Sequence, residues 1–216
     1  MTTPMTMARQ EREELAGLLA GLSPDQWDSP TLCERWRVRD VVAHVITYDT
    51  LDYAQLARRL VVSGFSVDRA NARGVADFAD RSPAELLDAL RAHLQPRGLT
   101  TTFGGRIALI DAMIHQRDIR RSLGLARTIA PDRLRAALDF TRYAPLIRGA
   151  WYARGVRLVA TDLDWSHGSG QEVRGNGEAL LRAMAGRRAA LDDLTGPGRS
   201  RLARQQRRVR MGKPNT

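Results

Sequence analysis

The stretch "IALIDAMIHQRDIRRSLG", residues 107–124, decides the fold, because it places ionisable groups inside the apolar stripe of an amphipathic helix. On a helical wheel with 100° per residue, Asp118 lies about 20° to one side of Asp111 and His115 about 40° to the other. Burying an unpaired carboxylate or histidine is costly, so we expect these groups to have partners in the core. The flanking apolar residues are Ile107, Ala108, Ile114 and Ile119, and the face predicted to meet water carries Gln116, Arg117 and Arg120.

Helix signals recur on both sides of this stretch. Ser23 and Ser82 are each followed by proline, with Gln26 or Glu85 three residues after the serine, which is typical of a capped helix start. Glycines end several apolar-periodic runs, as expected for helix C-termini. We predict helices over about residues 5–21, 36–62, 82–96, 104–123 and 131–145, and four long helices with short loops favour a bundle.

The sequence pattern changes after residue 150 from helical periodicity to short strand-like segments. The segment "VRLVATDLDW" (156–165) is short, apolar and β-branched, and "EVRG" (172–175) follows a Gly-Ser turn, so the two are predicted to form a hairpin. Helical spacing resumes at "NGEALLRAMAG" (176–186). We therefore expect a mainly α protein with a helical bundle over residues 1–148, a small α+β part over 149–198 and a basic, flexible tail over 199–216.

Composition limits the classes of function. The chain has 216 residues, 43% of them hydrophobic, no apolar run of membrane-spanning length and no signal-peptide pattern, so we expect a cytoplasmic globular protein that does not enter a membrane. Cys33 is the one cysteine; it excludes an intramolecular disulfide and is interpreted as a small buried apolar residue. Residues 198–216 contain six Arg, one Lys and no acidic residue, so this tail accounts for most of the net charge of +10. The tail also lacks aromatic residues that could stack on bases. Nucleic acid is therefore not the expected partner.

A second histidine occupies a similar apolar stripe. In "VRDVVAHVITYDTL" (38–51), His44 shares a face with Val41, Tyr48 and Leu51. Facing stripes meet in the core of a bundle, where two histidines and one carboxylate would give three ligands and leave metal coordination positions open. Two alternatives remain at this point: Asp111 and His115 form a hydrogen-bonded pair without an ion, or Asp118 orients an imidazole or pairs with a nearby arginine. His93 and His167 lack ligand spacing.

Three blocks of sequence carry a resemblance to a known family. They are "ELAGLLAGLSPDQWDSPTLCERWRVRDVVAHV" (14–45), "IDAMIHQRDIRRSLG" (110–124) and "DLDWSHGSGQEVRGNGEALLRAMAGRRAALDDLTG" (162–196). The chain resembles the mycothiol-dependent maleylpyruvate isomerase family of the DinB/YfiT-like metalloenzymes from about residue 8 to 198. The resemblance implies an antiparallel DinB-like four-helix bundle that binds a divalent ion.

The resemblance also implies roles for individual residues. The metal ligands would be His44, Asp111 and His115, and the family pattern has glutamate where this chain has Asp111. From its spacing alone, Asp118, three residues after His115, is expected to support a ligand imidazole without binding the ion itself. The metal would be zinc, with nickel, iron or manganese as alternatives. Arg187 is the positional match for a catalytic arginine that binds a substrate carboxylate.

The implied reaction is a mycothiol-dependent isomerisation of a dicarboxylate, in which a metal-bound thiolate adds to an activated double bond. A mycothiol S-transferase acting on small-molecule electrophiles is the first alternative. The second is a non-enzymatic metal-binding or regulatory module whose basic tail contacts nucleic acid or an acidic partner. A homodimer is left open.

Overall fold

The computed structural model describes residues 2–144, 147 and 149–211, with side chains described as far as residue 208. The fold is mainly helical, as predicted, with one small sheet near the C-terminus. Its contacts divide the chain into unit 1, residues 1–128, and unit 2, residues 129–216. The predicted helix end at residue 145, the predicted boundary at residue 148 and residues 212–216 lie outside the described residues.

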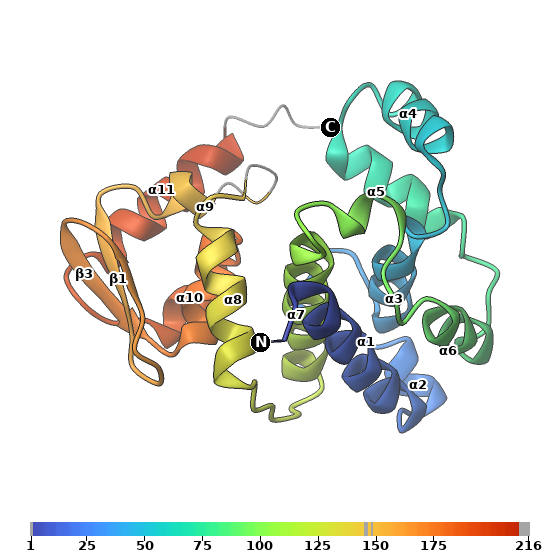
Figure 1. The fold of residues 1–216 in the computed structure, drawn as a ribbon, viewed down its shortest axis with the longest axis horizontal. Coiled ribbons are helices and arrows are strands. Elements are labelled where there is room, and N and C mark those ends of the chain that lie inside the picture. The colour runs from blue at the N-terminus through green and yellow to red at the C-terminus, as the bar shows by residue number, and fades with distance from the viewer. Residues whose placement is uncertain (1, 145–146, 148, 212–216) are drawn as a thin grey trace. The chain divides into compact units, whose positions relative to one another are not determined.

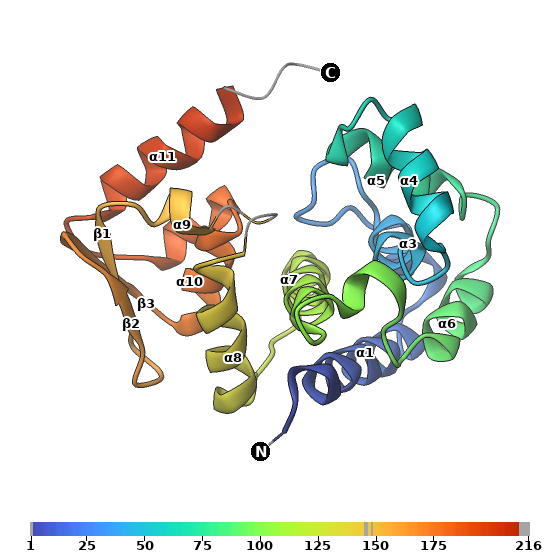
Figure 2. The same cartoon turned by 45° about the horizontal axis from the view of Figure 1, so that its top comes forward.

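Unit 1 is a four-helix bundle built from α1, α3, α6 and α7. Helix α1 packs against α6 and α7, and α3 packs against the same two helices; Figures 1 and 2 both show α1 beside α7. Buried leucine, valine and isoleucine side chains fill the core, among them Leu15, Leu19, Val41, Ile46, Leu90 and Ile119. The helices of unit 1 are α1 (Pro4–Ala20), α2 (Pro24–Trp27), α3 (Val38–Thr47), α4 (Tyr53–Val62), α5 (Val67–Ala76), α6 (Pro83–Ala92), the short η1 (Gly98–Thr101) and α7 (Arg106–Ser122).

The predicted helix starts at Ser23 and Ser82 are confirmed. Each serine side chain accepts a hydrogen bond from the third helical residue, and the side chain of Gln26 or Glu85 accepts one from the serine backbone. These capping boxes satisfy backbone groups that a helix start leaves unpaired. The proline after each serine needs no hydrogen-bond partner there.

The predicted single helix over residues 36–62 is wrong, because the chain breaks between α3 and α4. Asp52 caps α4 by accepting a hydrogen bond from the backbone N–H of Gln55, whose side chain accepts one in return. Asp49, in the break, turns into the protein to meet Arg12 of α1. A second short helix, α5, then follows, which the sequence pattern did not predict.

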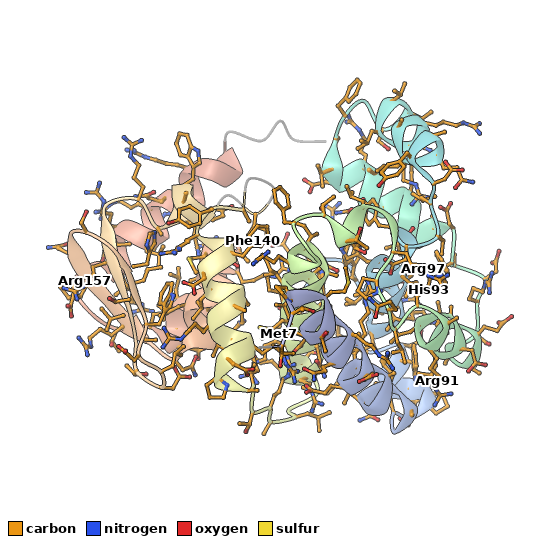
Figure 3. All side chains as sticks on the ribbon, in the orientation of Figure 1. Met7, Arg91, His93, Arg97, Phe140 and Arg157 are labelled. Carbon is orange, nitrogen blue, oxygen red and sulfur yellow. The ribbon has the colours of Figure 1, made fainter. Side chains whose placement is uncertain are left out.

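The Arg12–Asp49 pair is a buried ion pair that ties three parts of unit 1 together. The guanidinium Nη1 of Arg12 lies 2.5 Å from Asp49 Oδ2 and donates to the backbone carbonyl of His93 at 2.6 Å. The other carboxylate oxygen of Asp49 accepts from the Arg97 backbone N–H at 2.9 Å and from the Thr100 hydroxyl at 2.6 Å. Figure 3 shows His93 and Arg97 next to each other beside α3. Helix α1 is thereby fixed to the end of α3 and to the segment after α6.

Unit 2 combines helices with a three-stranded sheet. Helix α8, predicted as part of the bundle, packs here against α10, and Gly177 at the start of α10 lets the Leu134 side chain of α8 approach closely. Helix α10 also contacts β1 and β3. The elements are α8 (Pro131–Thr141), α9 (Gly149–Tyr152), β1 (Val156–Ala160), β2 (Ser166–Gly168), β3 (Gln171–Gly175), α10 (Gly177–Met184), the short η2 (Arg188–Asp193) and α11 (Arg199–Met211).

The hairpin predicted between "VRLVATDLDW" and "EVRG" is wrong, because the first segment pairs antiparallel with a different strand. The antiparallel partner of β1 is β2, with Leu158 opposite His167, whereas β3 pairs with β1 in parallel, with Leu158 opposite Val173. The chain crosses the end of β1 through Gly168 and Gly170, which have φ of 86° and 115°. A Cβ at Gly170 would lie 2.5 Å from the Gly155 carbonyl oxygen, so the crossover requires glycine.

Replacing Gly170 by alanine is expected to destabilise the chain by about 1–3 kcal/mol, because the new Cβ adds backbone strain to a close contact. Gly17→Ala is the matched control. Gly17 lies in the middle of α1 on its solvent-exposed side, and a Cβ added there would meet no atom within 4 Å. Gly17→Ala should therefore stabilise the protein by about 0.5–1 kcal/mol. Chemical denaturation of both variants measures the difference, and equal effects would contradict the crossover geometry.

The segment expected to be a flexible tail is helix α11 over residues 199–211. Leu202 and Gln206, one turn apart, are buried, and the Gln206 side chain donates to the Ala183 carbonyl of α10 at 2.9 Å. This buried pair anchors the helix, and the arginines up to residue 208 are exposed. None of the described helices combines the length and apolarity needed for a membrane span.

Candidate metal centre

Two neighbouring helices of the bundle bring the predicted ligands together. His44 comes from α3, and Asp111 and His115 come from α7, one turn apart. The Nε2 atom of His44 and the Nε2 atom of His115 each lie 3.4 Å from Asp111 Oδ1. The three side chains therefore direct one ligand atom each toward a common point.

The donor set and its spacing fit a divalent ion. Zinc binds imidazole nitrogen and carboxylate oxygen at about 2.0–2.2 Å, so two ligands of a tetrahedral site lie about 3.4 Å apart. The separations of Asp111 Oδ1 from His44 Nε2 and from His115 Nε2, both 3.4 Å, match that edge. Asp111 reaches both histidines despite being one methylene shorter than glutamate, so this carboxylate can serve as a direct ligand.

The electrostatics of the cluster favour a charged carboxylate. Burial raises the pKa of Asp111, but the charges and hydrogen bonds of His115 and His44 outweigh burial and hold that pKa well below its usual range. Burial likewise lowers the pKa of His115, but Asp111 and Cys33 outweigh it and raise that pKa to about 10. When no ion is bound, a proton on His115 therefore balances Asp111. Metal binding must displace that proton, since a ligating imidazole supplies a lone pair.

A short loop between α2 and α3 encloses the histidines from one side. Within it, the Thr31 hydroxyl donates to the Trp36 carbonyl at 2.9 Å and accepts from the Cys33 N–H at 3.1 Å. The Leu32 N–H reaches the Asp118 carbonyl at 3.5 Å, which ties the loop to α7. The Trp36 ring lies 4.8 Å from the His44 ring between centroids. The loop thus covers one histidine and brings Cys33 behind the other.

Cys33 forms a second cluster on the far side of His115. Its Sγ lies 3.4 Å from His115 Nδ1 and donates to Asp118 Oδ2 at 3.1 Å. The sequence interpretation of Cys33 is right about its burial and incomplete about its contacts. Cys33 and His115 are 82 positions apart, so only the fold brings them together. The available signal was the family-like block around residues 27–44, in which Cys33 stands between Trp27 and Trp36.

Asp118 lies where a supporting carboxylate is expected, but its contact with His115 is indirect. The Asp118 Oδ2 atom is 3.8 Å from His115 Nδ1, which is too long for a hydrogen bond, and the Cys33 Sγ atom is closer to each of them, at 3.1 Å and 3.4 Å. Asp118 is fully buried. The expected water-facing side of α7 is also corrected: Gln116 is fully buried, and Arg117 and Arg120 are partly buried.

The side of the centre at Asp111 is the more accessible one. The Asp111 side chain is 28% exposed, against 8% for His44 and 9% for His115. Tyr48, one turn after His44, presents its ring edge to that histidine at 6.1 Å between centroids and donates its hydroxyl to Asn71 of α5. Burial raises the pKa of Tyr48, so its hydroxyl stays protonated. Asp111 is therefore the most accessible of the three candidate ligands.

The other candidate residues lie away from this centre or in unit 2. His93 binds the Ala89 carbonyl through Nδ1 at 2.8 Å, as expected for a residue without ligand spacing. His167 lies in β2 of unit 2 and contacts Arg142 at 3.4 Å. Trp165 donates to Asp139 of α8 at 3.0 Å and so packs the strand region onto a helix. Arg187 precedes η2 in unit 2, and its role in binding a carboxylate stays a prediction.

Comparisons with known proteins identify the family and the fold. A family model described as the mycothiol maleylpyruvate isomerase N-terminal domain matches residues 8–120, which include Cys33, Trp36 and all three candidate ligands. Two crystal structures of the mycothiol-dependent maleylpyruvate isomerase, one of them a mutant with a histidine replaced by alanine, share the fold. Each has 16% sequence identity and a TM-score of 0.53, and covers 91% of this chain and 96% of its own. No curated protein matches.

Proposed function

Since the chain belongs to the mycothiol maleylpyruvate isomerase N-terminal domain family, we propose that it is a divalent-metal-dependent and mycothiol-dependent isomerase of the maleylpyruvate isomerase type. The observation that carries this proposal is the convergence of His44 Nε2, His115 Nε2 and Asp111 Oδ1, with both histidine nitrogens 3.4 Å from the carboxylate oxygen. Three protein ligands on one side leave room for a thiol and a substrate on the other.

A divalent ion in such a site lowers the pKa of a bound thiol and stabilises the thiolate. The protein residues supply the rest. His44 and His115 contribute neutral nitrogen donors, and Asp111 contributes one negative charge. The Trp36 ring restricts water around His44, which strengthens electrostatic interactions inside the centre.

The proposed reaction uses the thiol as a reversible nucleophile. The thiol first gives up its proton on binding, and the mycothiol thiolate adds to the activated cis double bond of the dicarboxylate while the adjoining carbonyl takes up the electron pair. Rotation about the new single bond follows, and departure of the thiolate restores the carbonyl and leaves the double bond in the trans form. Substrate and product have the same atoms, so the reaction needs no oxidant or reductant. Cys33 is buried behind His115, so the thiol is supplied by mycothiol.

The test is a turnover assay of the purified full chain with maleylpyruvate, mycothiol and a stoichiometric divalent ion. The proposal predicts isomerisation that needs both the thiol and the ion. Accumulation of mycothiol conjugates instead would assign an S-transferase, and binding of the ion without turnover of any electrophile would favour a regulatory module. The cytoplasmic location and a homodimer stay predictions.

Asp111→Asn is expected to lower metal affinity by at least about 10-fold, since it keeps the shape of the side chain but removes the negative ligand charge. The control is Asp88→Asn, an exposed aspartate of α6 whose side chain is 74% accessible. Metal affinity is measured by competition with a chromophoric chelator. If Asp111→Asn binds the ion as tightly as Asp88→Asn, the carboxylate is no ligand.

A further inference from the structure

We propose that Cys33 is a positioning residue for the metal centre, linking the His115 imidazole to the buried Asp118 carboxylate. This inference rests on the proposed function, because it concerns how His115 is presented to an ion. Cys33 acts on the metal centre indirectly, by contacting Nδ1 of His115, the ring nitrogen that is not the ligand atom Nε2. It touches neither the ion nor the substrate.

The distances identify the thiol as the connecting group. Cys33 Sγ lies 3.1 Å from Asp118 Oδ2 and 3.4 Å from His115 Nδ1, whereas the direct separation between carboxylate and imidazole is 3.8 Å. A thiol is a weak donor through S–H and a weak acceptor through sulfur, so one Cys side chain can serve both neighbours. The thiol hydrogen goes to Asp118, and sulfur accepts the Nδ1–H of His115.

This arrangement determines which imidazole nitrogen can bind a metal. With the hydrogen held at Nδ1, the lone pair of His115 lies at Nε2, which faces Asp111 and His44. Metal-ligating histidines commonly donate their second N–H to a carboxylate or carbonyl oxygen, and that bond sets both tautomer and ring orientation. Here a sulfur occupies the position of that acceptor, with the carboxylate one step further away.

The local structure holds Cys33 in place independently of His115. The Cys33 N–H donates to the Thr31 hydroxyl at 3.1 Å, its carbonyl accepts from the Trp36 N–H at 3.1 Å, and the preceding Leu32 N–H binds the Asp118 carbonyl. Two of these bonds fix the loop around Cys33, and the third joins the loop to α7. Cys33 is 7% exposed and Asp118 is fully buried, so little water can replace these contacts.

The same three side chains also have the spacing of a closed metal site, with Cys33, His115 and Asp118 as ligands. The geometry favours the positioning role, because the Sγ–Oδ2 contact is a hydrogen bond and all three residues are buried. A thiolate and a carboxylate held together without an ion would carry two buried negative charges at close range. The experiment separates the two possibilities.

The test is a titration of the metal-free full chain with Co²⁺, for the wild type, Cys33→Ala, Cys33→Ser and the control Val42→Ala. Cys33→Ala is expected to weaken Co²⁺ binding by about 10–100-fold, the usual loss when a partner of a metal-bound histidine is removed. Cys33→Ser should restore most of the affinity, because a hydroxyl can donate to Asp118 and accept from Nδ1. Val42→Ala removes buried methyl groups from the same core cluster and should leave Co²⁺ affinity unchanged.

A second readout follows the tautomer directly. Nitrogen-15 NMR of the Zn²⁺-loaded protein is expected to show His115 with hydrogen on Nδ1 in the wild type and in Cys33→Ser. In Cys33→Ala the Nδ1–H signal should broaden through exchange with solvent. A packing defect alone would change stability without changing this signal.

Several outcomes would overturn the positioning role. These are unchanged Co²⁺ affinity in Cys33→Ala, an equal loss in Val42→Ala, or a sulfur-to-cobalt charge-transfer band that disappears in Cys33→Ser. A second bound ion lost with Cys33 would also overturn it by making Cys33 a ligand. Failure of the wild type to bind any divalent ion would overturn the proposed function and this role together, whereas metal binding without isomerisation would overturn only the reaction.

Discussion

His115→Ala is expected to reduce divalent-metal affinity by more than about 100-fold and to abolish thiol-dependent isomerisation, because removing a ligand costs more than the 10–100-fold typical of its supporting partner. His115 is the residue on which both clusters depend. Its Nε2 lies 3.4 Å from Asp111 Oδ1 and its Nδ1 lies 3.4 Å from Cys33 Sγ. Metal content after dialysis and turnover with maleylpyruvate are the two measurements.

The control for that variant is His93→Ala. His93 is a histidine of the same unit whose imidazole Nδ1 bonds to the Ala89 carbonyl of its own helical turn at 2.8 Å, so its removal should leave metal content at the wild-type level. Thermal unfolding of both metal-free variants shows whether either has lost its fold. Retention of one ion per chain and of turnover in a folded His115→Ala protein would rule out the proposed centre.

Arg12→Met is expected to destabilise the protein by about 3 kcal/mol or more, since it leaves the buried carboxylate of Asp49 without its ion-pair partner. Arg12 and Asp49 have side chains 1% and 0% exposed and lie 2.5 Å apart. The remaining donors to Asp49 are the Arg97 N–H and the Thr100 hydroxyl, which carry no full charge. Chemical denaturation measures the loss of free energy of unfolding.

Arg9→Met provides the matched control on the same helix. Arg9 pairs with Glu13 at 2.8 Å, but the two side chains are 55% and 42% exposed, so that pair should contribute no more than about 0.5 kcal/mol. In the double variant Arg12→Met with Asp49→Asn, part of the lost stability should return because no charge remains buried. A loss in Arg12→Met as small as that in Arg9→Met would show that Asp49 is not held by this ion pair.

The local signals in the sequence predicted the helical fold and placed His44, Asp111 and His115 on helices that the structure brings together. The apolar stripe of α7 continues through Asp111 and His115 at helical spacing, and a one-turn spacing survives in any helix of this length. Serine caps predicted α2 and α6 for a similar reason, since a cap depends on residues within four positions. The break after α3 had such a signal in the pair Asp52 and Gln55, but the apolar periodicity across residues 36–62 masked it.

The features that the sequence did not reveal depend on distant parts of the chain. Cys33 looks like any small core residue until the loop and α7 come together, and Asp49 looks like a surface acid until α1 brings Arg12 beside it. The sheet needed similar information, because the parallel pairing of β1 with β3 arises from a glycine crossover at Gly168 and Gly170. Local sequence patterns do not indicate which distant residues will come into contact.

The central claim is that one divalent ion is bound by His44, Asp111 and His115, and X-ray absorption spectroscopy at the metal edge of the purified full chain tests it most directly. The expected result is one ion per chain with two imidazole nitrogens and a carboxylate oxygen among its ligands, and no protein sulfur when mycothiol is absent. The contradicting result is a protein without stoichiometric metal, or an ion bound to sulfur in the absence of mycothiol.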